Sequence, residues 1–354
     1  MRAEGAAERV LWDVVDEHLA EADYLFRAWT SALESPLHTL ATLERGLEAR
    51  LLAHVEALEV NDPALLDCLP ESLRQRLRDD AAAPTGRSLF AQPEDYEALL
   101  DHADPGVVAA ARAMALSAGS QVAFERCVLS ASYASRVDAQ AMLVVALLGA
   151  PAHHATLVDN LSRPTHQHAA LFALGYTGQL AFVPLLLAQL ALPEPRTRKL
   201  AAEAIATLTG LDLSLPELRA PISSDDDTLP SLVIDRTRDL VPTPVDDLPL
   251  VRDEAVAEWW AARPPQLSDT ARVLLGEPWT PASVLRALEQ LPLRRRPPLA
   301  LWLRVSTEGR VQLDTRALVR TQHTQIERAR AALAAAEAPA VAPRLPSWRR
   351  PCGR

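Results

Sequence analysis

The middle of the sequence repeats about every 30 residues, and this repeat restricts the chain to a small group of folds. Each repeated segment begins at a residue that favours the start of a helix, carries small residues inside and ends at a glycine. A glycine in that place can adopt the left-handed conformation that ends many helices. Four segments align in this way, and they cover residues 105–119, 135–149, 164–178 and 195–210.

Shorter apolar segments separate these four, at 122–131, 152–161 and 180–192, and a further one at 93–102 precedes the first. A helix, a tight turn and a second helix form the unit of an α-solenoid, in which each unit buries its apolar side by stacking on the next. Alanine and leucine, which favour helices, are abundant, while aromatic residues make up only 5%. We therefore predict an all-α fold with an α-solenoid of about four helix pairs over residues 90–210.

The flanking regions also have helical patterns. Apolar residues recur at helical spacing over 7–34, 37–59 and a shorter stretch through Leu77, so residues 1–80 are predicted to form an N-terminal helical region that includes a hairpin. Residues 211–250 are acidic and proline-rich and are predicted to be a linker. A C-terminal helical region is expected over 251–337, with helices at 253–262, 281–290, 294–305 and 317–336. The proline- and arginine-rich tail, 338–354, is predicted to be disordered.

Two pairs of small residues carry a resemblance to a known repeat. Ala169-Ala170 followed by Leu174-Gly175, and Ala201-Ala202, resemble the HEAT-like repeats known from phycobilisome-lyase-type proteins, in which a helix with Ala-Ala at its middle ends in Leu-Gly. This resemblance implies HEAT-like helix pairs as the solenoid unit. In repeats of this type the second helix of each pair lines the concave face.

The N-terminal helices resemble the opening of an uncharacterised proteobacterial HEAT-repeat family that is often encoded near type VI secretion genes. His18, Glu21 and Ala22 match its first helix, and Glu48, Arg50, Leu51, His54, Ala57 and Leu58 match the end of its second. Ala49 and the pair Val55-Glu56 depart from the family pattern. The resemblance implies an accessory role in type VI secretion and assigns no chemistry.

Charge and cysteine content limit the partners and the compartment. The net charge is −10 and the isoelectric point about 5.4, so the chain should repel phosphate backbones, and we predict no nucleic-acid binding. Three widely separated cysteines form neither a disulfide framework nor a zinc pattern, which favours the cytoplasm. Residues 165–193 lack charged side chains, but glycines and a proline interrupt them. Two buried helices explain this stretch better than a membrane span, so no membrane insertion is predicted.

Histidine pairs are the main candidates for metal binding. His153-His154 and His166-x-His168 are spaced by one and two residues, whereas ligands on one helix face are spaced by three or four. We interpret them as solvent-facing or capping residues and predict no metal and no cofactor. His18 and Glu21 do share a face; a structural hydrogen bond between the first two helices, with His54, is the preferred interpretation.

The sequence contains no phosphate-binding loop, nucleophile elbow or S-x-x-K motif, so we predict that the protein is not an enzyme. Cys127 is interpreted as an inert core residue, and the run from Arg294 to Arg296 as solvated. The C-terminal tryptophans are assigned to the core by default, with a docking patch as the alternative; they are Trp259, Trp260, Trp279 and Trp302.

A curved solenoid face typically holds peptides or proteins, so the predicted function is a protein-binding adaptor or scaffold. The alternative is an enzyme of the lyase or chromophore-handling type, by analogy with the repeats alone. The predicted contact residues come from the second helices and would line the concave face; they are Glu94, Asp95, Glu97, Glu125, Arg126, His153, His154 and Asp159.

Overall fold

The fold is all-α, as predicted. The computed structural model describes residues 12–81, 93–220, 242–262 and 272–336. Over these ranges the regular structure is helical except for a short antiparallel hairpin, β1 (Val273–Leu274) with β2 (Glu277–Pro278), and a single bridge between Arg219 and Val251. The tail predicted to be disordered, 338–354, lies outside the described residues.

The chain divides into two compact units, and the C-terminal region is shared between them. The first unit comprises Met1–Arg87, Glu289–Arg295 and Leu313–Arg328, and the second comprises Ser88–Leu288, Arg296–Gln312 and Ala329–Arg354. The C-terminal helical region predicted over 251–337 is therefore divided between the two units, with 289–295 and 313–328 in the first and the rest in the second.

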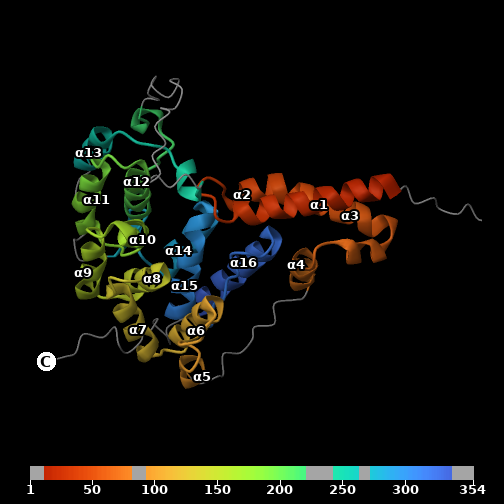
Figure 1. Ribbon diagram of the computed structural model, residues 1–354, viewed down its shortest axis with the longest axis horizontal. Coiled ribbons are helices and arrows are strands. Elements are labelled where there is room, and N and C mark those ends of the chain that lie inside the picture. Colours follow the sequence, from red (N-terminus) through yellow and green to blue (C-terminus); the bar gives the residue numbers. More distant parts are fainter. Residues whose placement is uncertain (1–11, 82–92, 221–241, 263–271, 337–354) are drawn as a thin grey trace, which may run out of the picture. The chain divides into compact units, whose positions relative to one another are not determined.

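The first unit is built on a pair of long helices, α1 (Trp12–Ala32) and α3 (Ala49–Asn61), which lie side by side (Figure 1). The chain between them forms α2 (Leu40–Leu43) and a π-helical turn, η1 (Glu44–Glu48). After α3 come η2 (Pro63–Cys68) and α4 (Glu71–Ala81). Their common core consists of Val15, Ala22, Leu25, Leu51, Val55, Leu58, Leu65, Leu69 and Leu73.

A histidine pair joins α1 to α3. The Nδ1 atoms of His18 and His54 lie 2.9 Å apart, and the two half-buried rings meet edge to face. The predicted interhelical hydrogen bond is therefore confirmed. Glu21 takes no part in it and instead lies 3.9 Å from Arg50.

A buried carboxylate also organises this unit. Glu48, at the end of the π-helical turn, accepts hydrogen bonds from Trp29 Nε1 at 2.9 Å and from the backbone N–H of Val319 at 2.7 Å. Val319 begins α16 (Val319–Ala336), so Glu48 satisfies one of the free N–H groups at that helix start. Burial raises the pKa of Glu48, although these hydrogen bonds act in the opposite direction.

Replacing Glu48 by alanine is expected to lower the free energy of unfolding of the first unit by about 2 kcal/mol. Two buried N–H groups would lose their acceptor, and the loss of a buried charge would offset part of that cost. Urea unfolding and hydrogen exchange at the start of α16 measure the effect. Glu44→Ala, at the exposed end of the same turn, is the matched control. Equal stability of the two variants would contradict this role for Glu48.

The second unit contains the repeat. Its helices are α5 (Pro93–Glu97), α6 (Pro105–Ser117), α7 (Gln121–Ser132), α8 (Ala139–Leu148), α9 (Pro151–Asn160) and α10 (Pro164–Leu174), followed by η3 (Leu180–Phe182), α11 (Val183–Leu190) and α12 (Pro195–Thr209). Each helix from α5 to α10 packs on the next along the chain, as do α11 and α12, and α10 also packs between α8 and α12 (Figure 1). Packing of neighbouring repeats in this way is what the predicted period requires.

The closing glycines do not all serve the same purpose. Gly119, Gly178 and Gly210 have φ angles of 86°, 71° and 75°, so they adopt the left-handed conformation expected of them. Gly149 has a φ of −69°, so the expectation is wrong there. Position 149 instead requires glycine because a Cβ there would collide with the Val145 carbonyl oxygen.

The segment predicted to be a linker is packed where the structure describes it. Leu211, Leu218 and Leu248 are buried, and Ala220 N–H donates to the Leu250 carbonyl at 2.9 Å. The two arms of this segment therefore run back against each other, and they include η4 (Pro216–Leu218) and η6 (Pro244–Asp247). The prediction followed the acidic and proline content and overlooked the leucines.

The remaining helices were predicted to within a few residues; they are α13 (Asp253–Ala261), α14 (Pro281–Gln290), the 3-10 turn η7 (Leu293–Arg295) and α15 (Arg296–Ser306). The arginine run at the start of α15 is not solvated as predicted. Arg295 is 6% and Arg296 only 1% exposed. Arg296 Nε donates to the Leu288 carbonyl at the end of α14, at 2.6 Å, and burial lowers the pKa of Arg296 to about 10.

A short segment after α13 crosses the ends of three repeat helices; we call it the clasp, residues 272–276. Its backbone N–H groups donate to the Gly178, Thr207 and Leu208 carbonyls at 2.8, 2.9 and 2.8 Å. The Arg272 guanidinium donates to four more carbonyls at 2.8–3.3 Å; these belong to Ala146, Leu147, Tyr176 and Thr177. The clasp thus satisfies carbonyl groups that the ends of α8, α10 and α12 leave unpaired.

Candidate protein-binding surface

The structure places the predicted contact residues on α5, α7 and α9, but it does not expose all of them. Glu94, Asp95, Glu125, Arg126 and Asp159 are exposed, and Glu97 is half-buried. Of the two histidines of the set, His153 is half-buried and His154 is fully buried. The predicted surface therefore keeps its charged members and loses its histidines.

His154 is fully buried, so its assignment to a contact surface is wrong. Its ring packs against Phe182, with centroids 6.1 Å apart. Burial, with a further contribution from the nearby charge of Arg272, lowers the pKa of His154 to about 4. Its imidazole is therefore neutral near pH 7 and cannot attract an acidic partner.

The other histidines of the repeats have structural contacts. His153 Nδ1 accepts the Ala150 N–H at 3.0 Å and so caps the start of α9, as one of the sequence interpretations held. His166 is buried, with its Nε2 atom 3.0 Å from the Tyr133 carbonyl, so it is not solvent-facing. No group of three histidine, cysteine, aspartate or glutamate side chains that could hold a metal occurs in the described ranges.

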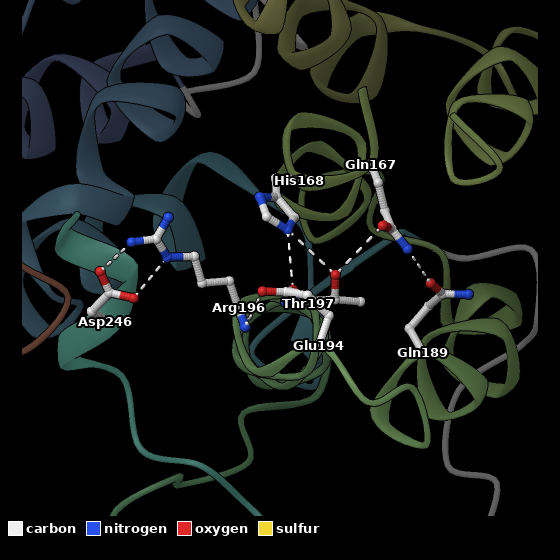
Figure 2. Close-up of polar contacts among 7 residues, drawn as sticks. All are labelled: Gln167, His168, Gln189, Glu194, Arg196, Thr197 and Asp246. Carbon is white, nitrogen blue, oxygen red and sulfur yellow. Dashed lines mark hydrogen bonds and ion pairs between the residues drawn. The ribbon is translucent and has the colours of Figure 1, made fainter. Parts of the chain in front are cut away.

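His168 belongs to a polar cluster at the start of α12 (Figure 2). Its Nε2 atom lies 3.3 Å from both Glu194 Oε2 and Thr197 Oγ1. Thr197 also contacts Gln167, which in turn donates to Gln189 on α11 at 3.1 Å. The cluster therefore joins α10, α11 and α12 through side chains that satisfy one another.

Glu194 and Arg196 extend this cluster. Partial burial opposes ionisation of Glu194, but hydrogen bonds from Thr197 and Arg196 lower its pKa, so the carboxylate is a stable cap for α12. Arg196 makes two hydrogen bonds of 2.8 Å to Asp246 on η6, and this contact lowers the pKa of Asp246 (Figure 2). These contacts fix neighbouring elements to one another, which is a structural role.

Exposed apolar side chains form a line along α7. Val122, Leu129 and Tyr133 are 43%, 54% and 51% exposed. The spacing of seven residues places Val122 and Leu129 on one face of α7 (Gln121–Ser132), together with Glu125 and Arg126, and Tyr133 follows on the same side as the residue that ends the helix. We call this face the α7 surface: Val122, Glu125, Arg126, Leu129 and Tyr133. The opposite face of α7 is buried through Phe124, Cys127 and Ala131.

An acidic segment before α6 contacts α7 through two of its carboxylates. We call residues Glu94, Asp95, Glu97, Asp101 and Asp104 the acidic flank. Asp101 pairs with Arg126 at 2.6 Å, and Glu97 accepts a hydrogen bond from Ser120, which caps α7. The hydrogen bond to Asp101 is the main cause that raises the pKa of Arg126. These contacts hold the chain around α5 next to the first turns of α7.

Cys127, behind the α7 surface, is the core residue that the sequence predicted. It is fully buried, and burial raises the pKa of its thiol to about 12. A thiol with such a pKa is a poor nucleophile at neutral pH.

The tryptophans follow the core interpretation in part. Trp302 is buried and meets Trp279 edge to face with ring centroids 5.7 Å apart. The Arg272 guanidinium carbon lies 4.6 Å from the centre of the Trp279 ring, so this pair supports the clasp. Trp259 and Trp260 are half-buried on α13.

Comparisons with known proteins identify no relative: no family model, no curated protein and no solved structure matches the chain. In the part of the chain that the structure describes, every helix is too short or too polar to cross a membrane.

The sequence interpretation missed the apolar part of the α7 surface. It identified Glu125 and Arg126 on this helix and described 122–131 only as a short apolar helix. A helical projection contains the missing signal, because Val122, Leu129 and Tyr133 lie opposite Phe124, Cys127 and Ala131. The α7 surface therefore combines exposed apolar side chains with two charged ones.

Proposed function

We propose that this chain is a non-catalytic adaptor that binds a protein partner through the α7 surface. The observation that carries the proposal is the line of Val122, Leu129 and Tyr133, each about half exposed on one helix face. Single exposed apolar residues are common on soluble proteins, whereas several on one helix face favour an interaction site. Glu125 and Arg126 lie between Val122 and Leu129 and make this face amphipathic.

The causes of the displaced pKa values favour the adaptor role over the lyase alternative. A catalytic site requires reactive groups that converge on a substrate. Among the described residues with displaced pKa values, Asp138 and Glu194 cap helices, Asp246 pairs with Arg196, and His154 is fully buried near Arg272. Each of these displacements has a structural cause.

The proposal includes the cytoplasm as compartment and a type VI secretion component as the first partner class to test. The cysteine pattern supports the compartment. The resemblance of the N-terminal helices to a family encoded near type VI secretion genes supports the partner class. The lack of charged residues over 165–193 fits two buried repeat helices.

A photoreactive amino acid at position 129 tests the proposal in the native host. We expect it to cross-link one defined protein, because the side chain at this position projects from the centre of the α7 surface. Val60, which is 79% exposed on α3 in the first unit, gives the control position. The same cross-linked proteins at both positions, or none at 129, would argue against an adaptor surface on α7.

Leu129→Glu is expected to weaken binding of the cross-linked partner by at least about ten-fold, which corresponds to about 1.4 kcal/mol. The carboxylate would replace buried apolar area at the centre of the contact. Purified proteins and isothermal titration give the dissociation constants. The free energy of unfolding should change by no more than about 0.5 kcal/mol, because Leu129 is exposed in the free chain. Val60→Glu should bind like the unaltered protein.

A further inference from the structure

We propose that the segment bound by the α7 surface is an amphipathic helix with an apolar stripe and an arginine-rich edge. This inference rests on the proposed function and specifies the chemistry of the partner. It depends on the acidic flank, which contacts the first half of α7 through Asp101 and Glu97. Both features come from the same part of the second unit.

The charge next to the first half of the α7 surface is mainly negative. Residues 93–104 contain five carboxylates and neither lysine nor arginine. Arg126 is the cation among the five residues of the α7 surface, and its ion pair with Asp101 offsets its charge. Glu94, Asp104 and Glu125 are exposed in addition. At the other end of the surface Arg163 donates to the Ser132 carbonyl, so the negative charge belongs to the Val122 end, and a positively charged edge on the partner complements it there.

The dimensions suit a helix. Val122 and Tyr133 are separated by 11 residues, which corresponds to about 16 Å along the axis of α7. Leucines at positions i, i+4, i+7 and i+11 of a partner helix cover the same length, so apolar residues can meet Val122, Leu129 and Tyr133 one by one. Such a stripe leaves one edge of the partner helix facing the acidic flank.

Arginine fits this edge better than lysine. Its planar guanidinium makes two parallel hydrogen bonds to a carboxylate and is less strongly hydrated than an ammonium group. The exposed Glu94 of the acidic flank offers the two carboxylate oxygens that a guanidinium binds. The same charge repels phosphate groups, so nucleic acids and anionic membranes are unsuitable partners.

Designed peptides test the inference before the partner is identified. The probe is a fluorescein-labelled 18-residue helix with leucines at the spacing above and arginines along one edge. One twin carries glutamate in place of each arginine, and a second carries serine in place of each leucine. Fluorescence anisotropy with the full chain should show that the probe binds at least ten-fold tighter than either twin. Raising the salt from 50 to 500 mM should weaken its binding about ten-fold.

A charge-swapped chain provides the decisive comparison. Glu94→Arg with Glu125→Arg should reverse the preference, so that the glutamate twin binds tighter than the arginine probe. Circular dichroism first shows whether the variant is folded. If it is not, the salt dependence of probe binding to the unaltered chain tests the inference instead. Equal binding of the probe and the glutamate twin would overturn the inference, as would binding of the serine twin at the strength of the probe.

Failure of this inference can be separated from failure of the proposed function. If both leucine peptides bind equally and Leu129→Glu abolishes binding of both, the α7 surface binds protein without regard to charge. If position 129 cross-links no partner in the host, the proposed function itself fails. Self-association of the chain that Leu129→Glu abolishes would identify a second copy as the occupant and would also overturn the inference.

Discussion

Replacing Arg272 by alanine is expected to lower the free energy of unfolding of the second unit by about 4 kcal/mol. The guanidinium donates to carbonyls at the ends of two repeat helices, among them Leu147 at 2.8 Å and Thr177 at 2.9 Å. Water cannot fully replace these bonds, because the guanidinium is half-buried against the Trp279 ring. Carbonyl groups left without a donor in such a place carry most of the cost.

Two further substitutions define the cause of this loss. Arg272→Lys retains the charge but not the planar set of donors, so about half of the stability should be lost. Arg27→Ala removes an arginine that is 71% exposed on α1 and should change stability by less than about 0.5 kcal/mol. A lysine variant as stable as the unaltered chain would mean that charge alone accounts for the role of Arg272.

Urea unfolding with hydrogen exchange measures these effects and locates them. In Arg272→Ala, protection should fall first in the last turns of α8 and α10, whose carbonyls lose their donor. The first unit should keep its protection, because the clasp belongs to the second unit. A uniform loss across the chain would contradict a local role for the clasp.

The clasp also shows why part of this fold could not be predicted. Arg272 contacts residues more than 90 positions earlier in the chain, and no local pattern records a contact of that range. The strands that follow it are two residues long, too short for alternating hydrophobicity to reveal them. Gly210 ends α12 as predicted, but no sequence pattern indicates that a Cβ there would also lie 2.6 Å from the Leu275 carbonyl oxygen.

The repeat itself was predictable because its information is local. Helix-start residues, apolar spacing and closing glycines act within one turn or one helix, so they gave helix bounds within a few residues. The stacking of α8, α10 and α12 then follows, because no single pair can bury its apolar side alone. The four-fold pattern was sufficient for the fold class even where Gly149 departed from its expected conformation.

The predicted contact residues differ in exposure, and the reason is helix phase. His154 belongs to the predicted set, yet it lies three residues before the buried Leu157, on the same side of α9. Leu129 is absent from that set, although it lies on the same side of α7 as Glu125 and Arg126. A helical projection of each repeat helix separates the exposed positions from the buried ones.

Asp138→Ala is expected to lower the free energy of unfolding of the second unit by about 3 kcal/mol. Asp138 caps α8 by accepting the Ala141 N–H at 2.9 Å, and it accepts the Ser130 hydroxyl of α7 at 2.8 Å. Arg112 of α6 pairs with the same carboxylate at 2.9 Å, and the two side chains are only 20% and 12% exposed. One carboxylate therefore joins three consecutive helices.

A double-mutant cycle separates the ion pair from the helix cap. Arg112→Ala, Asp138→Ala and the double variant should give a coupling energy of about 1–3 kcal/mol, since each single change leaves a partly buried partner without its contact. Asp138→Asn should cost less than alanine, because asparagine can still cap α8. Asp159→Asn, on the exposed face of α9, is the control. Additive effects of the two alanine changes would show that Asp138 acts as a cap alone.

The pH dependence of stability tests the same carboxylate in its charged form. Burial opposes ionisation of Asp138, but hydrogen bonds from Arg112, Ala141 and Ser130 outweigh it and lower the pKa in the folded chain. The folded state therefore binds this proton less tightly than the unfolded state, whose aspartate pKa is about 3.9. The stability due to Asp138 should be complete above that value and decline as the pH falls toward the folded pKa.

The asparagine variant provides the comparison. Asp138→Asn has no proton to bind at this position, so the difference in unfolding free energy between the unaltered chain and the variant should shrink as the pH falls below about 3.9. An unchanged difference from pH 6 to pH 3 would mean that the carboxylate is not the charged partner of Arg112 in solution.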